Sequence, residues 1–229
     1  MEKSDFIKWA RKLQSTYEPS DETRAQLSNV DLLAIVGPTG AGKSTIIDKL
    51  GLPYVMSDVS REPRNEEKHN RNYHFRTDYL QIINEIKNGS YVQFLVSKYD
   101  EFYGTRSSSY PNEGVCTMAI IARVIPEFRK LGFRSIKTIY VMPPSYVEWM
   151  HRIGSTRKDD LLGRISEARQ SILMALDDEK YEFVLNDSLD LAVDEIKTII
   201  AGEERDKARA QLAYDTADIL LEHIGDEEE

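Results

Sequence analysis

One glycine-rich segment constrains the fold of this chain more than any other feature. Residues 37–45 read Gly-Pro-Thr-Gly-Ala-Gly-Lys-Ser-Thr, between the apolar run 32–36 and the amphipathic run 46–50. This order predicts a strand, a phosphate-binding loop and a helix. Glycines in such a loop allow successive backbone N–H groups to converge on one phosphate, and the helix N-terminus adds partial positive charge.

The loop predicts that the chain binds a nucleoside triphosphate, with ATP and Mg²⁺ as the expected pair. Lys43 is expected to reach the β- and γ-phosphates, and the hydroxyl of Ser44 is expected to ligate Mg²⁺. A glycine turn that binds nothing is the alternative, but the strand before it and the helix after it favour the nucleotide site. The predicted ATP-binding residues of the loop are Gly37, Pro38, Thr39, Gly40, Ala41, Gly42, Lys43, Ser44 and Thr45.

Composition narrows the classes of function. The chain has 229 residues, enough for one domain with inserted pieces, and its formal net charge of −9 argues against a general nucleic-acid binder. The single cysteine, Cys116, allows no disulfide within the chain and favours a reducing compartment. No apolar run approaches membrane-spanning length. We therefore expect a cytoplasmic protein that binds small molecules and contacts neither nucleic acid nor a membrane.

Apolar strand-like runs alternate with helical patterns along the chain, and this alternation predicts an α/β fold with a parallel sheet. The expected core comprises residues 31–56 and 110–201, and residues 57–109 form a small α+β insertion. Residues 1–30 hold a helix and a linker, and residues 202–229 hold a helix and an acidic tail. We expect the two terminal helices to pack on each other or on the core, or to make a dimer contact.

Two polar segments carry arginines. Residues 57–76 are dense in charged side chains of both signs, and composition alone is equally consistent with a solvated loop and with an anion site. Residues 152–164 are cationic and interrupted by glycine, a pattern typical of a mobile lid.

The order of short motifs along the chain resembles that of the guanylate kinase family. The resemblance covers about residues 31–201. Besides the loop, it rests on Ser57-x3-Arg61-x2-Arg64, Tyr73, Tyr103-Gly104-Thr105, the arginines of residues 152–164, and Val184-Leu185-Asn186-Asp187. It implies the three-layer α/β/α fold of P-loop NTPases, with residues 57–109 as the acceptor-binding insertion. It also implies an ATP-dependent phosphotransferase whose acceptor is a nucleoside monophosphate.

The resemblance implies a role for each matching residue. The acceptor's phosphate is expected to bind Ser57, Arg61, Arg64, Tyr73 and Tyr103, and its base is expected to contact Thr105. On the ATP side, Asn186 is an expected binding residue, and the expected catalytic residues are Lys43, Arg152, Arg157 and Arg164. Guanidinium groups suit these tasks because they form charge-assisted, bidentate hydrogen bonds with phosphate.

The chain departs from the family where guanine is read. Gln93, or Phe94 if no gap is allowed, stands where the family has a glutamate, and the stretch 118–125 is apolar where the family has two aspartates. A neutral amide lacks the charge and the paired acceptors that guanine favours, so weak guanine selectivity is expected. Asp100 or Glu101 could instead have taken over the lost carboxylate's task.

Three functions remain open. The first is a nucleoside monophosphate kinase acting on GMP, dGMP or another base. The second is a kinase of the same fold acting on a phosphosugar such as ribose 1,5-bisphosphate, and the retained set Arg61, Arg64, Tyr73 and Tyr103 counts against it. The third is a non-catalytic binding module, and the intact loop 37–45 counts against that. Either a monomer or a homodimer fits the sequence.

Overall fold

The computed structural model describes residues 1–64, 67–71, 73–156 and 161–225. The chain divides into two compact units. The first unit comprises Met1–Leu32, Pro53–Cys116 and Glu127–Ser135, and the second comprises Leu33–Leu52, Thr117–Pro126 and Ile136–Glu229. Among the described residues, no helix is long and apolar enough to cross a membrane.

Most of the central sheet belongs to the second unit. Its strands lie in the order β6 (Gly114–Ala119), β1 (Val30–Val36), β7 (Ser135–Met142) and β8 (Tyr181–Leu185). Strands β7 and β8 pair in parallel, and β1 is apolar almost throughout. Such continuous apolar strands are typical of a parallel sheet that is covered on both faces.

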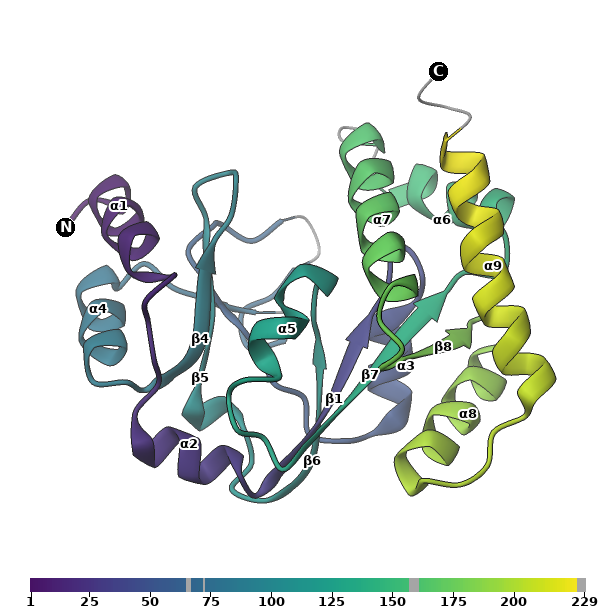
Figure 1. Cartoon of the computed structure of the whole chain (residues 1–229). Helices are drawn as coiled ribbons and strands as arrows, with labels where there is room; N and C mark the ends of the chain where they lie inside the picture. The colour runs from purple at the N-terminus through teal and green to yellow at the C-terminus, as the bar shows by residue number, and fades with distance from the viewer. Residues whose placement is uncertain (65–66, 72, 157–160, 226–229) are drawn as a thin grey trace. The chain divides into compact units, whose positions relative to one another are not determined.

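Helices cover the two faces of this sheet and complete the three layers expected for the fold. The helices of this part of the chain are α3 (Lys43–Leu50), α6 (Tyr146–Thr156), α7 (Leu161–Leu176), α8 (Leu189–Ala201) and α9 (Lys207–Gly225). Ile139 and Val141 of β7 pack in one cluster with α3 and α8. The alternate residue Tyr140 forms a hydrogen bond with Ser171 of α7, and Phe183 of β8 contacts Tyr214 of α9. Figure 1 shows these helices around the sheet.

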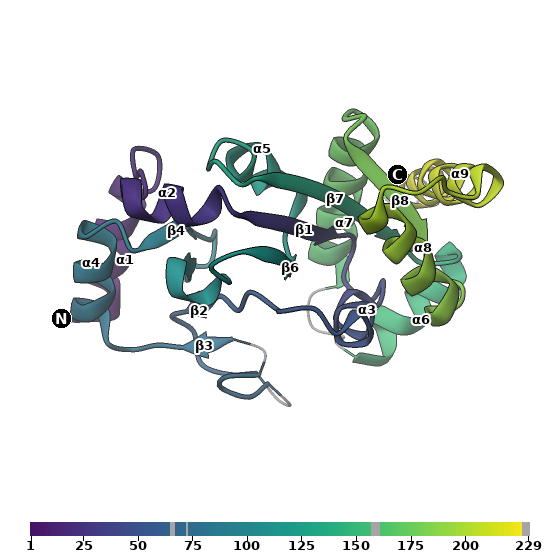
Figure 2. The same cartoon turned by 90° about the horizontal axis from the view of Figure 1, so that it is seen from below.

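The first unit is a smaller α+β assembly. Its sheet has the strand order β3 (His74–Phe75), β2 (Asp58–Val59), β5 (Phe102–Arg106) and β4 (Tyr91–Val96), and its helices include α1 (Lys3–Leu13), α2 (Asp21–Leu27) and α4 (Tyr79–Lys87). Helix α1 lies against α4 and β4 (Figure 2). Apolar side chains of α1, α4, β4 and β5 form the core of this unit, with Phe6, Ile82 and Phe102 completely buried.

The N-terminal segment also covers the edge of strand β4. The side-chain oxygen of Gln14 accepts a hydrogen bond from the backbone N–H of Val96 at 2.7 Å, and the hydroxyl of Tyr17 donates to the carbonyl of Tyr91 at 2.6 Å. Covering an edge strand in this way prevents unwanted pairing with another chain. The expected packing on the core is confirmed for α9, which contacts β8, α7 and α6, whereas α1 packs on α4 and β4 of the predicted insertion.

Candidate nucleotide and acceptor sites

The glycines of the phosphate-binding loop adopt backbone conformations that other residues rarely adopt. Gly37, Gly40 and Gly42 have φ angles of 142°, 83° and 95°. A Cβ atom at Gly37 would lie 2.4 Å from the carbonyl oxygen of Val141, and one at Gly42 would lie 2.2 Å from Asn186 Nδ2. Glycine is therefore required both for the turn and for the close approach of its neighbours.

Side chains around the loop hold its carbonyl groups. Lys43 Nζ donates to Gly37 (2.6 Å) and Pro38 (2.9 Å), Trp149 Nε1 donates to Thr39 (2.8 Å), and Asn186 Nδ2 donates to Ala41 (2.7 Å). These hydrogen bonds fix the loop's carbonyl groups, and the loop leads into the N-terminus of α3, where backbone N–H groups and the helix dipole favour an anion. The expected strand, loop and helix are thus confirmed.

The side chains at the start of α3 match the expected nucleotide site. Burial lowers the pKa of Lys43 to about 8, and the carboxylate of Glu167 on α7 opposes this shift. Ser44 and Thr45 are exposed in the first turn of the helix, so the Ser44 hydroxyl is open to a metal ion bound with the phosphates. Hard oxygen donors of this kind suit Mg²⁺, which usually keeps several waters and binds substrate phosphates.

The segment that was expected to form a lid is helical at its described ends. Arg152 lies on α6, where its Nε donates to Glu148 Oε1 at 2.9 Å. Arg164 lies on α7, and its Nε and Nη1 atoms are buried. Arg157 lies outside the described residues. The catalytic roles of the three arginines stay predictions.

Strand register decides which residue stands at the guanine-reading position. Gln93 pairs with Thr105 across the β4–β5 hairpin, and Phe94 pairs with Gly104. Directly paired residues share a face of the sheet, so Gln93 lies on the face of Thr105. Phe94 lies on the opposite face and is buried in the core of the first unit. Gln93 rather than Phe94 is therefore the candidate base-reading residue.

Arg61, Tyr73 and Tyr103 come together on the acceptor side. The Nε of Arg61 donates to the Tyr103 hydroxyl at 3.2 Å, and its guanidinium carbon lies 5.1 Å from the centre of the Tyr73 ring. The rings of Tyr73 and Tyr103 meet edge to face. A guanidinium with a phenol on either side can bind and orient a phosphate group.

Glu67 occupies the outer edge of this guanidinium, and sequence reasoning missed it. Its two carboxylate oxygens accept from Arg61 Nη1 and Nη2 at 2.5 and 2.9 Å, and Oε2 also accepts from the backbone N–H of Arg64 at 2.9 Å. Burial disfavours the charged carboxylate, but these hydrogen bonds outweigh it and hold the Glu67 pKa below its usual value. A carboxylate thus takes the position that a phosphate oxygen pair would take on Arg61.

The other expected acceptor residues lie close to this cluster in the chain. Ser57 immediately precedes β2, and its carbonyl accepts from the backbone of His74. Thr105 is completely buried, and its hydroxyl lies 2.9 Å from that of Tyr110. The side chain of Arg64 is exposed. Their contacts with an acceptor stay predictions.

Asp100 and Glu101 lie at the turn of the β4–β5 hairpin, away from the Gln93–Thr105 pair. Asp100 pairs with Arg11 at 2.6 Å, and Glu101 pairs with Lys3 at 2.7 Å. Both carboxylates are thus engaged by α1, which disfavours the idea that either replaces the family's guanine-reading glutamate.

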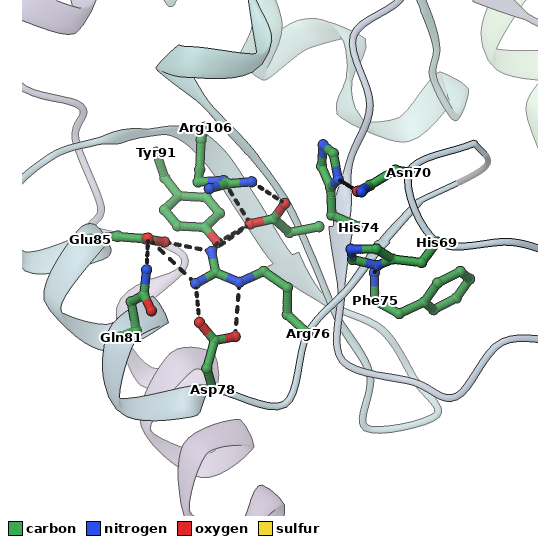
Figure 3. A network of polar contacts seen from close by, with 11 residues as sticks. His69, Asn70, His74, Phe75, Arg76, Asp78, Gln81, Glu85, Tyr91 and Arg106 are labelled. Atoms are coloured by element: carbon green, nitrogen blue, oxygen red, sulfur yellow. Dashed lines mark hydrogen bonds and ion pairs between the residues drawn. The ribbon is translucent and has the colours of Figure 1, made fainter.

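A buried charge network in the first unit joins strands β2 and β5 to helix α4 (Figure 3). The carboxylate of Asp58, completely buried in β2, accepts from Arg76 at 2.9 Å, from Tyr91 at 2.6 Å and from Arg106 at 3.2 Å. Arg76 also pairs with Asp78 and with Glu85 of α4 (Figure 3). Arg76 therefore joins β2 to α4, so not every arginine of residues 57–76 serves an anion site.

The strand, glycine loop and helix within three α/β/α layers, together with an arginine–tyrosine cluster in a separate unit, define the class of P-loop phosphotransferases. Comparison with known proteins identifies the family within this class. The family model described as guanylate kinase matches residues 29–203. The chain therefore belongs to the guanylate kinase family.

Curated relatives and a solved structure agree with this assignment. The chain is 29% identical over 202 residues to the guanylate kinase of Shouchella clausii, covering 80% of this chain and 93% of the relative. It is 30% identical over 201 residues to that of Oceanobacillus iheyensis, covering 80% and 92%. The crystal structure of guanylate kinase from Anaplasma phagocytophilum shares the fold, with a TM-score of 0.50 and 19% identity over 80% of this chain and 92% of that one.

Proposed function

We propose that the protein transfers the γ-phosphoryl group of ATP to a nucleoside monophosphate, with GMP and dGMP as the first candidate acceptors. The observation that carries the proposal is the phosphate-binding loop, whose carbonyls are held by Lys43, Trp149 and Asn186. A module that only binds an acceptor does not need a loop that binds the phosphates of ATP. Membership of a family of ATP-dependent phosphotransferases supports the same reading.

On the ATP side, the chain's own groups position and neutralise the triphosphate. The amide edge of the loop binds a phosphate group, and the Lys43 ammonium binds the β- and γ-phosphates. Mg²⁺ held by Ser44, phosphate oxygens and water would neutralise charge on those phosphates. Arg152, Arg157 and Arg164 are proposed to spread positive charge over the phosphoryl group in transit.

On the acceptor side, Arg61, Tyr73 and Tyr103 bind the phosphate of the monophosphate. A phosphate that bonds Arg61 through its outer edge must displace the carboxylate of Glu67, because the two groups compete for the same donors. Arg64, whose side chain is exposed, then supplies a second guanidinium. Gln93 meets the base and offers one acceptor and one amide donor group.

The substrates and the cysteine fit the cytoplasm, which is the compartment we propose. Burial raises the pKa of Cys116 to about 12, so this thiol stays protonated and inert. No partner beyond the two small-molecule substrates is proposed, and the protein is either a monomer or a homodimer.

A coupled assay of ADP release tests the function. All ribo- and deoxyribonucleoside monophosphates and ribose 1,5-bisphosphate are compared as acceptors, with Lys43→Ala as the inactive reference. We expect ADP release with at least one nucleoside monophosphate and its loss in Lys43→Ala at an unchanged melting temperature. Release with ribose 1,5-bisphosphate alone would establish the phosphosugar kinase, and monophosphate binding without turnover would establish the binding module.

Arg61→Ala separates the two halves of the site in the same assay. We expect it to raise the KM for the acceptor and to lower kcat, with the KM for ATP nearly unchanged. An equal loss of ATP affinity would contradict the acceptor-side assignment of Arg61.

A further inference from the structure

Helix α9 lies beyond the residues that match the guanylate kinase family, yet it reaches back to the nucleotide side. The family match ends at residue 203, and α9 begins at Lys207. It packs on β8 and α7 (Figure 1). Arg205, two residues before α9, and Arg209, in its first turn, are largely buried, with side chains only 15% and 17% exposed.

Arg209 binds the residues on both sides of Asn186. Its Nη2 donates to the carbonyl of Leu185 at 2.9 Å and to Asp187 Oδ1 at 2.5 Å, and its Nη1 donates to Asp187 Oδ2 at 3.2 Å. Its Nε donates to Glu195 of α8 at 3.2 Å. These hydrogen bonds from Arg209 hold the Asp187 pKa below its usual value, although burial opposes the shift. One planar guanidinium therefore fixes the backbone before Asn186 and the side chain after it.

Asn186 in turn holds the phosphate-binding loop. Its backbone N–H donates to Met142 at 2.8 Å, and its side-chain amide donates to Ala41 at 2.7 Å. That amide nitrogen stands where a Cβ of residue 42 would be. The orientation of the Ala41 carbonyl, and hence of the amide edge that faces the anion, depends on where residues 185–187 lie.

We propose that Arg209 is a positioning residue for triphosphate binding, which acts through Leu185 and Asp187 to hold Asn186 against the loop. The proposal rests on the proposed function. Without Arg209, the Asp187 carboxylate and the Leu185 carbonyl lose their shared donor, and the segment that carries Asn186 keeps only its sheet contacts with Met142 to hold it in place. Loops that bind phosphate tolerate such shifts poorly, because binding depends on several convergent N–H groups at once.

Arg205 provides a matched control. It is equally buried and shares Glu195 with Arg209, but its other hydrogen bonds go to Glu182 and to the carbonyl of Phe183. Loss of either arginine removes a charged hydrogen bond to Glu195 of α8 and a hydrogen bond to a carbonyl of β8. Only loss of Arg209 removes the contacts on either side of Asn186.

The test measures ATP binding by calorimetry without acceptor, in wild type, Arg209→Gln, Arg209→Lys and Arg205→Gln. We expect both glutamine variants to lower the melting temperature. Arg209→Gln alone should raise the Kd for ATP, by about fivefold to tenfold, the effect of losing one neutral hydrogen bond such as that from Asn186 to Ala41. Arg209→Lys should recover part of the affinity, and the KM for the acceptor should not change.

A double-mutant cycle with Asn186→Ala separates positioning from general destabilisation. If Arg209 acts through Asn186, adding Arg209→Gln to Asn186→Ala should raise the Kd for ATP no further. Full additivity of the two substitutions, or an ATP affinity of Arg209→Gln within twofold of wild type, would overturn the proposal. A wild-type protein that binds no ATP would instead refute the proposed function, and this role with it.

Discussion

Lys43 should make ATP binding depend on pH just above neutrality. Burial lowers its pKa to about 8 in the empty site, far below the usual lysine value. The triphosphate brings negative charge to the ammonium and therefore favours its protonated form. ATP binding between pH 8 and pH 9 should accordingly take up a proton.

The size of the effect follows from the protonated fraction of Lys43. With a pKa of about 8, roughly nine tenths of the empty sites carry the ammonium at pH 7 and roughly one tenth carry it at pH 9. If only the ammonium form binds the triphosphate, the apparent affinity scales with that fraction. The apparent Kd for ATP should therefore rise about tenfold from pH 7 to pH 9. The last ionisation of a phosphate group has a pKa of about 6, so it is almost complete at pH 7. It therefore adds little to the change in Kd between pH 7 and pH 9.

Calorimetric titration of ATP without acceptor, in two buffers of different ionisation enthalpy, measures both the Kd and the number of protons taken up. Lys43→Arg is the control, because a guanidinium stays charged throughout and its ATP affinity should not vary between pH 7 and pH 9. A constant wild-type Kd over this range, with no proton uptake at pH 8.5, would refute the reasoning.

Two further substitutions and one truncation test the first unit. Gln93→Glu should raise kcat/KM for GMP, relative to other monophosphates, by about ten- to a hundredfold, because a hydrogen bond to a charged acceptor contributes about 1.5–3 kcal/mol. A wild-type preference for GMP above about a hundredfold would contradict this prediction. Asp58→Asn should lower the unfolding free energy by about 3–5 kcal/mol in chemical denaturation, since it removes the buried carboxylate that Arg76, Tyr91 and Arg106 share. Asp48→Asn, at an exposed position, should change it little. Deleting residues 1–17 should lower the melting temperature by uncovering α4 and β4, and an unchanged melting temperature would exclude this packing role.

The sequence predicted the strand, glycine loop and helix of the nucleotide side correctly because their signal is local. The glycines, Lys43 and Ser44 are neighbours in the chain, and the apolar strand before them defines their context. The hydrogen bond from Asn186 to Ala41 joins residues 145 positions apart, so spacing alone could not reveal it. Residues 122–128 form a 3-10 turn (Ala122–Val124) and the short helix α5 (Ile125–Phe128).

The acceptor side was harder to predict because its geometry depends on strand register. The sequence of β4 left Gln93 and Phe94 as alternatives, and a shift of one residue in a strand exchanges the two faces. The pairing of Phe94 with Gly104 on the core side favours Gln93, and its base-reading role stays a prediction. Glu67 was missed for a related reason: an acidic residue in a charged segment carries no signal until its distance to Arg61 is known.

The two terminal segments outside residues 29–203 each support a predicted substrate residue, which argues that they serve binding as well as stability. Lys3 of α1 pairs with Glu101, whose other oxygen accepts from Ser60 at 3.0 Å, directly beside Arg61 in the chain. Ser60 also accepts from the backbone of β5, one residue before Tyr103. Helix α1 thus contacts the segment that carries Arg61, and Arg209 of α9 contacts the residues on both sides of Asn186. Loss of α1 should therefore affect the KM of the acceptor, and loss of Arg209 the affinity for ATP.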